Sequence, residues 1–333
     1  MKTKEINLEY APTIDGLTFR SFAGNSDYQA MLSIINEASR VDKDDRATTL
    51  KDIEYDYAHL THSDPKTDMI FAEINGNTVA YSRVQWWQEK DPNDRIYSLF
   101  VNILPDWRNQ DIEGAMIKWC EARLNVISQS HPNDSKRFFQ TYSSAEKPDF
   151  NNILDSQGYT ANRFFIEMSR SLENIPEGEL PEGIDGRPVM EEDTHKIWEA
   201  SNEAFRDHWG FVEPEEKDYV SYKGSKYFQP ELWQVAWDGD EVVSSVMNYI
   251  EHDYNKTYQR KRGWTENIST HREWRRRGIA RALIIRSMHM HKAKGMTEVA
   301  LGVDTKNPSG ALKLYQSLGY KKDKTNITYR KPM

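Results

Sequence analysis

The stretch THREWRRRGIARAL, residues 270–283, decides the fold of this 333-residue chain. Four arginines and then Gly278 lie between a segment that alternates like a strand and a segment with helical periodicity. A helix start leaves backbone N–H groups unpaired and carries partial positive charge, so it holds anions through main-chain donors. Side chains nearest such an anion must be very small, as those of Gly278 and Ala280 are. The stretch therefore predicts an anion-binding turn between a strand and a helix.

An earlier stretch, ILPDWRNQDIEGAM at residues 103–116, follows the same outline. Trp107 and Trp274 are 167 positions apart, and on that alignment Asp111 and Glu113 take the places of Gly278 and Ala280. A carboxylate about 4 Å from a phosphate costs about 4 kcal/mol at an effective dielectric constant of about 20, nearly a thousandfold in affinity. We therefore expect the later copy to bind an anion and the earlier copy to exclude one.

The similarity between the two stretches belongs to a repeat that spans the chain. INEA at 35–38 matches SNEA at 201–204, Asn75-Gly76 matches Asp238-Gly239, and SQGY at 156–159 matches SLGY at 317–320. Asn-Gly and Asp-Gly are typical of tight hairpins because their turns need positive φ. Each half reads β-α-(α)-β-β-β-α-β-α-β. This order predicts an α/β fold in which helices flank a mixed sheet.

Between the two copies lies ENIPEGELPEGIDG, residues 173–186, whose prolines and glycines are typical of a linker. We therefore predict a first domain at residues 1–172, a linker at 173–185 and a second domain at 186–333. The chain is about twice the usual domain length of roughly 100 to 200 residues, which agrees with this division.

Composition excludes several classes of function. The chain carries 52 acidic and 44 basic residues, a net charge of −8 that opposes nucleic-acid binding as its main activity. It contains no apolar run of the ~18 residues that a membrane span needs and no signal-peptide pattern, so we expect a cytoplasmic protein. The single cysteine, Cys120, lies in a helical, apolar-periodic stretch, and the histidines lack metal-ligand spacing. We expect no disulfide and no metal site.

The second half resembles the GNAT superfamily of N-acetyltransferases. Its signature, Arg/Gln-x-x-Gly-x-Gly/Ala at a strand-to-helix turn, is matched by Arg275, Gly278 and Ala280. GWTENIST at 263–270 resembles the family's acyl-binding strand, and EVALGVDTKNPSGALKLYQSLGY at 298–320 resembles the following strand and helix. The doubled unit, with the intact signature in the second copy, is similar to tandem GNAT proteins such as mycothiol synthase. The resemblance implies two tandem GNAT domains, of which the first is degenerate.

The resemblance implies that the second domain moves an acetyl group from acetyl-CoA to a primary amine by direct attack, without a metal. The acceptor is then a small-molecule or peptide amine, and the chain is a monomer or a homodimer. An alternative is a regulatory module that binds acyl-CoA without turnover.

The resemblance also implies roles for individual residues of the second domain. Glu266 matches a base that accepts the amine proton, or it is a solvated strand carboxylate; Tyr315 matches a general acid, or it is a core aromatic. Asn307 matches a residue that contacts the pantetheine arm, or it only caps a helix. The segment containing Asp207 and His208 falls on the acceptor side, where a structural role is equally open. The residues expected to bind acetyl-CoA are Ile268, Ser269, Thr270, Arg275, Arg276, Arg277, Gly278, Ile279, Ala280, Arg281 and Asn307.

Overall fold

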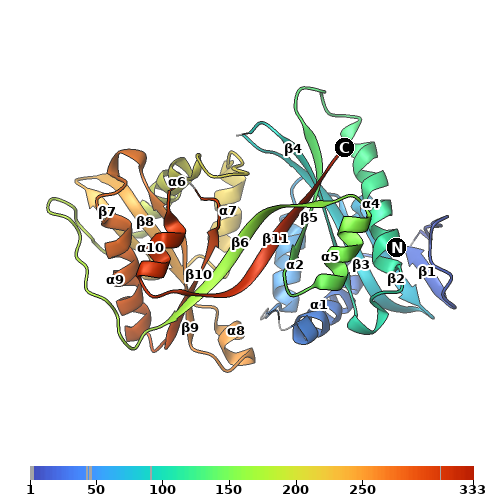
Figure 1. Cartoon of the computed structure of the whole chain (residues 1–333), viewed down its shortest axis with the longest axis horizontal. Helices are drawn as coiled ribbons and strands as arrows, with labels where there is room; N and C mark the ends of the chain where they lie inside the picture. The colour runs from blue at the N-terminus through green and yellow to red at the C-terminus, as the bar shows by residue number, and fades with distance from the viewer. Residues whose placement is uncertain (1–3, 43, 45–46, 91, 308) are drawn as a thin grey trace. The chain divides into compact units, whose positions relative to one another are not determined.

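The computed structural model describes residues 4–42, 44, 47–90, 92–307 and 309–333. The chain divides into two compact units (Figure 1). Unit 1 comprises residues 1–163 and 326–333, and unit 2 comprises residues 164–325. Helices and strands alternate in both, and the strands form mixed parallel and antiparallel pairs, which confirms the predicted α/β class.

Unit 1 is built around strands in the order β1-β2-β3-β4-β5-β11. Its strands are β1 (Leu17–Arg20), β2 (Met69–Ile74), β3 (Asn77–Gln88), β4 (Arg95–Ile103), β5 (Arg137–Ser144) and the last part of β11 (Lys321–Pro332). Its helices are α1 (Tyr28–Asp42), α2 (Leu50–Ala58), α3 (Pro65–Asp68), α4 (Ile112–Ser128) and α5 (Pro148–Ser156). The β2–β3 hairpin turns at Asn75 and Gly76, whose φ values of 50° and 80° confirm the predicted tight turn.

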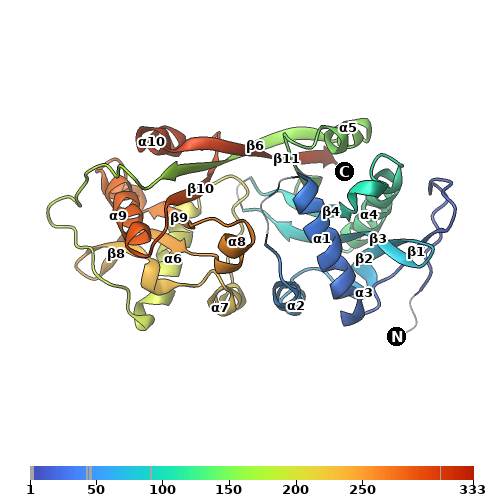
Figure 2. The ribbon, with the colours of Figure 1, turned by 90° about the horizontal axis from the view of Figure 1, so that it is seen from below.

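Helices pack on both faces of the unit 1 sheet because strand side chains alternate in direction. In β2, Ile70 and Ala72 join a buried cluster with Ile112 and Met116 of α4. Phe71, between them in the strand, joins a different cluster that includes residues of α1. Helices α4 and α1 can be followed on the sheet in Figure 2.

Unit 2 has the strand order β6-β10-β9-β8-β7. The strands are the later part of β6 (Thr160–Ser171), β7 (Gln234–Asp238), β8 (Glu241–Tyr249), β9 (Arg262–Thr270) and β10 (Glu298–Asp304). The helices are α6 (Thr194–Phe205), α7 (Glu216–Gly224), α8 (His252–Thr257), α9 (Ile279–Ala293) and α10 (Ala311–Ser317). The apolar face of α9 joins one core cluster, and Ile197 of α6 joins another.

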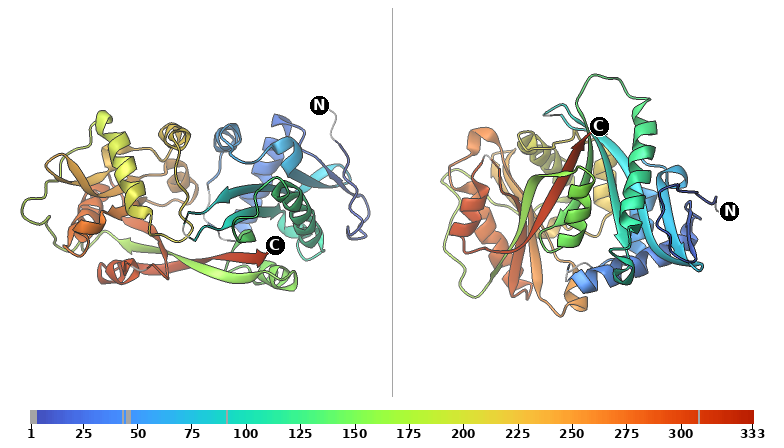
Figure 3. Two further views of the ribbon diagram at one scale, coloured as in Figure 1. Left: turned by 90° about the horizontal axis from the view of Figure 1, so that it is seen from above. Right: turned by 45° about the vertical axis from the view of Figure 1, so that its right-hand side comes forward.

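Each unit is completed by the last strand of the other repeat. Residues 165–171 of β6 pair antiparallel with β10 in unit 2, and residues 326–332 of β11 pair antiparallel with β5 in unit 1. Strand β11, drawn in red, runs to the C-terminus in both views of Figure 3. The compact units therefore divide the chain differently from the repeat-based boundaries at 172 and 186, because an exchanged strand counts with the sheet it pairs with.

The segment at 173–185, predicted as a linker, packs on unit 2. The side chains of Ile175, Leu180 and Ile184 contact the core cluster that contains α9. The carbonyl of Glu177 accepts a hydrogen bond of 2.9 Å from Arg281 in α9. These contacts give the segment a fixed place that its proline- and glycine-rich sequence does not reveal.

Two further differences from the expected order concern unit 2. The strand that should open the second repeat in the order predicted for each half is reduced to one bridge between Asp185 and Trp237, and Pro188 has no N–H to extend it. Helix α8 is an additional element between β8 and β9. Among the described residues, no helix is both long enough and apolar enough to span a bilayer.

The strand exchange predicts that a core residue of β6 stabilises unit 2. Met168, which is 2% exposed, belongs to the same cluster as Leu283 of α9. Met168→Ala should lower the opening free energy of α9 amides by about 2 to 5 kcal/mol because a buried methionine is removed. Hydrogen exchange followed by mass spectrometry measures this loss of protection.

Met116→Ala is the matched control, since Met116 is fully buried in unit 1 and should lower protection in α4 instead. Loss of protection in α4 rather than α9 on replacement of Met168 would contradict the assignment of β6 to unit 2.

Candidate functional site

The site begins where strands β9 and β10 stop pairing. These parallel strands are in register from Arg262 with Glu298 to Trp264 with Ala300, and the paired residues end there. Strand β9 nevertheless continues to Thr270 and β10 to Asp304. The two strands therefore splay apart, and the edge of β9 that faces β10 has no strand partner after Trp264.

The predicted binding residues on β9 leave their backbone groups available between the separated strands, because their side chains make other contacts. The Ser269 hydroxyl is 2.9 Å from that of Ser245, and the Thr270 hydroxyl is 2.9 Å from that of Ser244. Ile268 packs against the unit 2 core. A ligand in the splay would meet backbone groups here.

The turn after β9 has the backbone of an anion cradle. Arg276 and Gly278 have φ values of 62° and 82°, and α9 begins at Ile279. Alternation of left-handed and ordinary conformations turns successive N–H groups toward one side, which suits an anion. A Cβ atom added to Gly278 would meet no other heavy atom within 4 Å. The space that the glycine leaves open is therefore available to a ligand.

Arginine side chains around the turn fasten it to α6. Arg275 donates to Asp207 at 3.0 Å, to the Ala204 carbonyl at 3.0 Å and to the Thr270 carbonyl at 3.1 Å. Arg272 donates to both carboxylate oxygens of Asp207, at 2.9 and 2.7 Å. Hydrogen bonds from Arg272 and then Arg275 lower the pKa of Asp207 to about 2. Asp207, a substrate-side candidate from the sequence, is thus engaged as a permanent anion that holds the turn.

The other predicted residues of the turn have mixed surroundings. Arg276 and Arg277 are exposed, and the Arg277 guanidinium lies 4.6 Å from the Trp274 ring centroid. Ile279 is buried in the core, Ala280 is partly exposed, and Arg281 bonds to the segment that precedes unit 2's first helix. His208 packs edge-on against Phe205, with ring centroids 4.5 Å apart.

Glu266 lies inside the splay. Its carboxylate accepts a hydrogen bond of 3.0 Å from the backbone N–H of Gly302 on β10. Burial raises the pKa of Glu266 to about 8; the Gly302 N–H opposes this rise and the nearby Glu167 adds to it. A carboxyl group that titrates near neutrality differs sharply from a solvated strand carboxylate. Perturbed carboxyl groups of this kind concentrate at functional sites.

Tyr315, on α10, is 5% exposed and belongs to the unit 2 core with Tyr320. Burial raises the pKa of Tyr315, and the charge of Glu266 raises it further, so the two candidate catalytic groups lie within electrostatic range of each other. Asn307 lies four residues before α10 and accepts a hydrogen bond of 2.9 Å from the Ser309 N–H. It shapes the turn before the helix and is not the residue at its cap, which is Gly310.

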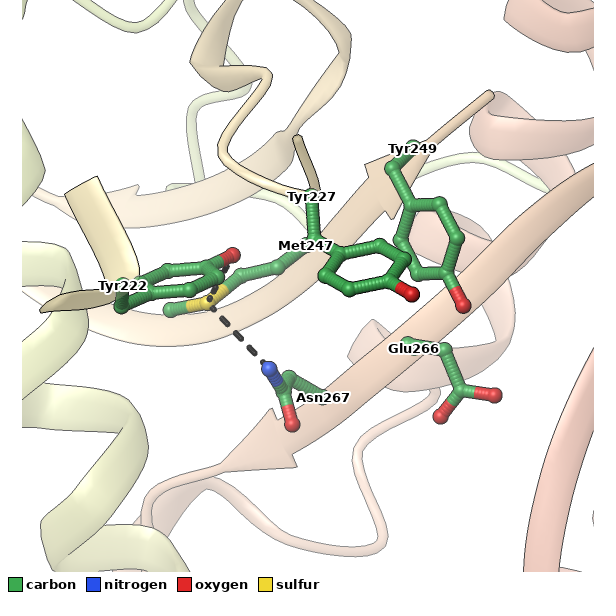
Figure 4. Close-up of a pocket in the computed structure, with 6 residues that line it drawn as sticks. All are labelled: Tyr222, Tyr227, Met247, Tyr249, Glu266 and Asn267. Carbon is green, nitrogen blue, oxygen red and sulfur yellow. Dashed lines mark hydrogen bonds between the residues drawn. The ribbon is translucent and has the colours of Figure 1, made fainter. Parts of the chain in front are cut away.

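Two adjoining cavities open beside Glu266. One of about 300 Å³ is lined by Tyr222, Tyr227, Met247, Tyr249, Glu266 and Asn267 (Figure 4). The other, of about 220 Å³, shares Tyr222, Met247 and Asn267 and adds Trp198, Ser201, Asn202 and Phe205 from α6. No motif in the sequence predicts a role for these tyrosines. The aromatic-rich run YVSYKGSKYF at 219–228 was the available signal.

The same turn in unit 1 keeps the backbone and changes the side chains. Asn109 and Asp111 both have φ of 60°, as in the cradle of unit 2, and α4 begins at Ile112. Glu113 is 3% exposed, and burial raises its pKa while backbone contacts with Glu113 and Asn109 lower it. A carboxyl group therefore lies among the main-chain donors of this helix start.

The two candidate acid–base positions of unit 1 carry leucines. Leu99 pairs with Val84 across the strands as Glu266 pairs with Met247, so Leu99 takes the position of Glu266. Leu154 on α5 lies five residues before Tyr159, as Tyr315 lies five residues before Tyr320, and it is fully buried. Among the described residues of either unit, no three His, Cys, Asp or Glu side chains gather as a metal site requires.

Comparisons with known proteins agree with this geometry. Residues 194–320 match the model of the acetyltransferase (GNAT) family. A mycothiol acetyltransferase from Geodermatophilus obscurus is 22% identical over 283 residues, which cover 82% of this chain and 85% of that protein.

Two solved structures share the architecture. A GCN5-related N-acetyltransferase from Sphaerobacter thermophilus has a TM-score of 0.73 at 23% identity, with 96% of each chain covered. A tandem GNAT protein from the clavulanic acid biosynthesis pathway has a TM-score of 0.62 at 10% identity, covering 95% of this chain and 98% of that one. These likenesses establish the fold. Residues 194–320 form a domain of the acetyltransferase (GNAT) family, and the chain that carries them is an acyltransferase.

Proposed function

We propose that the chain transfers an acetyl group from acetyl-CoA to a primary amine, with the chemistry in unit 2. The observation that carries the proposal is the position of Glu266, a carboxyl group of raised pKa that lies in the strand splay and lines a cavity. The charge of Glu266 also raises the pKa of Tyr315, so a second titratable group lies within electrostatic range of Glu266. The family of the domain and the acetyltransferase names of its relatives support an acetyl donor.

The residues present fit acetyl-CoA. The open space at Gly278 and the N–H groups at the start of α9 suit its pyrophosphate, with the exposed Arg276 and Arg277 nearby. The unpaired edge of β9 at residues 268–270 offers hydrogen-bonding groups for the pantetheine arm and the acetyl oxygen. Acetyl-CoA supplies the activated acetyl thioester.

Glu266 would remove the proton that the attacking amine must lose. A lysine-like amine has a pKa near 10.4, so freeing its neutral form at pH 7 costs roughly 4.6 kcal/mol. A carboxylate whose pKa lies near 8 accepts a proton much more readily than an ordinary glutamate, and it is still ionised in part at neutral pH. The burial that raises its pKa therefore suits Glu266 to the work of a base.

Tyr315 would assist departure of the thiolate from the acetyl group. An ordinary phenol has a pKa about 1.5 above that of a thiol, so full proton transfer to a departing thiolate is already uphill. Burial raises the pKa of Tyr315 further and keeps its O–H protonated. We therefore assign Tyr315 as a hydrogen-bond donor that stabilises the departing sulfur, with the final proton supplied by solvent.

Unit 1 would not bind a second acetyl-CoA. The carboxyl groups of Asp111 and Glu113 stand at its helix start, and one of them is buried there.

The alternative for the whole chain, an acyl-CoA-binding module without turnover, predicts binding of acetyl-CoA with no thiol release in the presence of any amine.

The proposed base predicts a specific pH dependence. Below pH 8, kcat/KM of the wild type and of Glu266→Gln should rise in parallel, because each requires loss of one proton. Between about pH 8 and the amine's own pKa near 10, the wild type should level off while the variant keeps rising. Acetyl-CoA-dependent thiol release measured from pH 6.5 to 10 tests this convergence.

Stability provides the control for this variant. The pKa of Glu266 is higher in the folded chain than its ordinary value, so ionisation costs folding free energy as pH rises toward 8. Glu266→Gln lacks that cost and should be at least as stable as the wild type at pH 9 in thermal unfolding. A ratio of wild-type to variant kcat/KM that stays constant up to pH 10 would exclude Glu266 as the base.

The proposed cradle predicts that Gly278→Glu weakens acetyl-CoA binding by two to three orders of magnitude, because it places a carboxylate beside the pyrophosphate. Gly295→Glu is a matched control at the other end of α9. Gly295 has φ of 83°, against 82° for Gly278, and neither glycine has a neighbouring heavy atom within 4 Å of an added Cβ.

Isothermal calorimetry with acetyl-CoA compares the two variants. Both should show similar losses of stability from backbone strain, and the weaker binding should be confined to Gly278→Glu. Equal affinities would place the pyrophosphate elsewhere.

A further inference from the structure

The cavities beside Glu266 have aromatic walls. Tyr227 and Tyr249 meet edge to face with ring centroids 4.9 Å apart, and Tyr249 stacks on Trp264 at 6.0 Å. Figure 4 shows the hydroxyl ends of Tyr227 and Tyr249 on the side of the Glu266 carboxylate. Tyr222 closes the other side, where it meets Met247. The adjoining cavity continues this surface with Trp198 and Phe205.

The described residues that line the two cavities also include few charged side chains. Among the described residues that line the two cavities, Glu266 is the carboxylate, and there is no arginine or lysine. Nearby acids already have cations: Glu251 pairs with Lys226 at 2.6 Å, and Glu167 pairs with Arg262 at 3.0 Å. A cation that enters the cavity would therefore meet Glu266 as its counter-charge.

The combination of tyrosine rings and one carboxylate selects a class of amine. An ammonium group is attracted both by a carboxylate and by the faces of aromatic rings. Lys226 illustrates this attraction, because its ammonium lies 5.3 Å from the Tyr227 ring centroid. Apolar walls favour an apolar body behind the ammonium group.

Other classes of amine fit these walls less well. Among the described lining residues, a sugar amine would find polar partners at Ser201, Asn202, Asn267 and the tyrosine hydroxyls. Those of its hydroxyl groups that face the tyrosine rings would lose hydrogen bonds to water, at about 1 to 3 kcal/mol each. A polyamine would bring further charges to a cavity with one carboxyl group, and an acidic amine would place a second carboxyl group beside Glu266 with no arginine or lysine among the described lining residues to pair with it. We infer that the acceptor is a monoamine on an aromatic or alkyl body, held between the tyrosines with its nitrogen at Glu266.

This inference rests on the proposed function, and the experiment separates the two. The probes are 2-phenylethylamine, glucosamine and spermidine, measured in two ways. Equilibrium binding is followed by ligand-detected NMR without acetyl-CoA, and acetyl transfer is followed by thiol release. We expect kcat/KM for 2-phenylethylamine to exceed that for glucosamine and spermidine by at least tenfold. In the binding measurement, we expect 2-phenylethylamine to bind saturably and the other two amines not to.

Tyr227→Leu tests the aromatic wall. Tyr227 is 38% exposed, so the fold should tolerate the change. Loss of one ring face should raise the Kd and KM for 2-phenylethylamine about threefold to tenfold, while kcat stays within about twofold. Tyr142→Leu, at a 54% exposed tyrosine of unit 1, is the matched control and should change neither constant.

The outcomes distinguish the two proposals. Binding of 2-phenylethylamine that depends on Tyr227, without acetyl transfer, would support the ligand class and contradict the proposed function. More efficient acetylation of glucosamine or spermidine would overturn the ligand class and leave the proposed function standing. Absence of amine binding, or an unchanged Kd in Tyr227→Leu, would also overturn the ligand class.

Discussion

The end of pairing between β9 and β10 at Trp264 and Ala300 is the constraint on which the site depends. Because the strands separate there, β9 has an unpaired backbone edge and the Gly302 N–H of β10 is free to bind the Glu266 carboxylate. The same separation leads β9 into the turn at Gly278 and the start of α9. One interruption of a sheet thus aligns a backbone edge, a helix start and a carboxyl group of raised pKa.

Unit 1 keeps this backbone arrangement without the side chains to which we assign the chemistry of unit 2. Strands β4 and β5 also stop pairing, at Ser98 and Gln140, and the helix start that follows has the same left-handed residues. Its chemistry has been replaced by Leu99 in the strand and by acidic side chains at the turn. The two repeats therefore share the backbone arrangement that the fold requires and differ in the side chains that the proposed catalysis would require.

Local features were predictable from the sequence because short-range physics determines them. The Asn75-Gly76 turn, strand β9 and the glycine before α9 depend on neighbouring residues and on periodicity. The destination of β6 and β11 was not predictable, because an antiparallel strand of suitable pattern can complete either sheet. The alternation of apolar residues along a strand indicates which of its faces is buried, but it does not identify the strand with which it pairs.

The site shows the same limit. Glu266 and Tyr315 could be named from a motif, whereas the pairing of Asp207 with Arg272 joins residues 65 positions apart. The tyrosine walls combine Tyr222 of α7 and Tyr227 of the following loop with Tyr249 of β8, so only the folded chain brings them around one cavity. Ion pairs and cavities of this kind arise from tertiary packing, which local sequence patterns do not specify.

The most direct test of the account is the number of acetyl-CoA molecules that one chain binds. Calorimetric titration of the intact protein measures this number independently of the amine acceptor. The account predicts one molecule per chain, because unit 2 offers an open helix start and Asp111 and Glu113 occupy the equivalent position in unit 1. A stoichiometry of two would contradict it, since the acidic turn would then bind the donor as well as the glycine turn does.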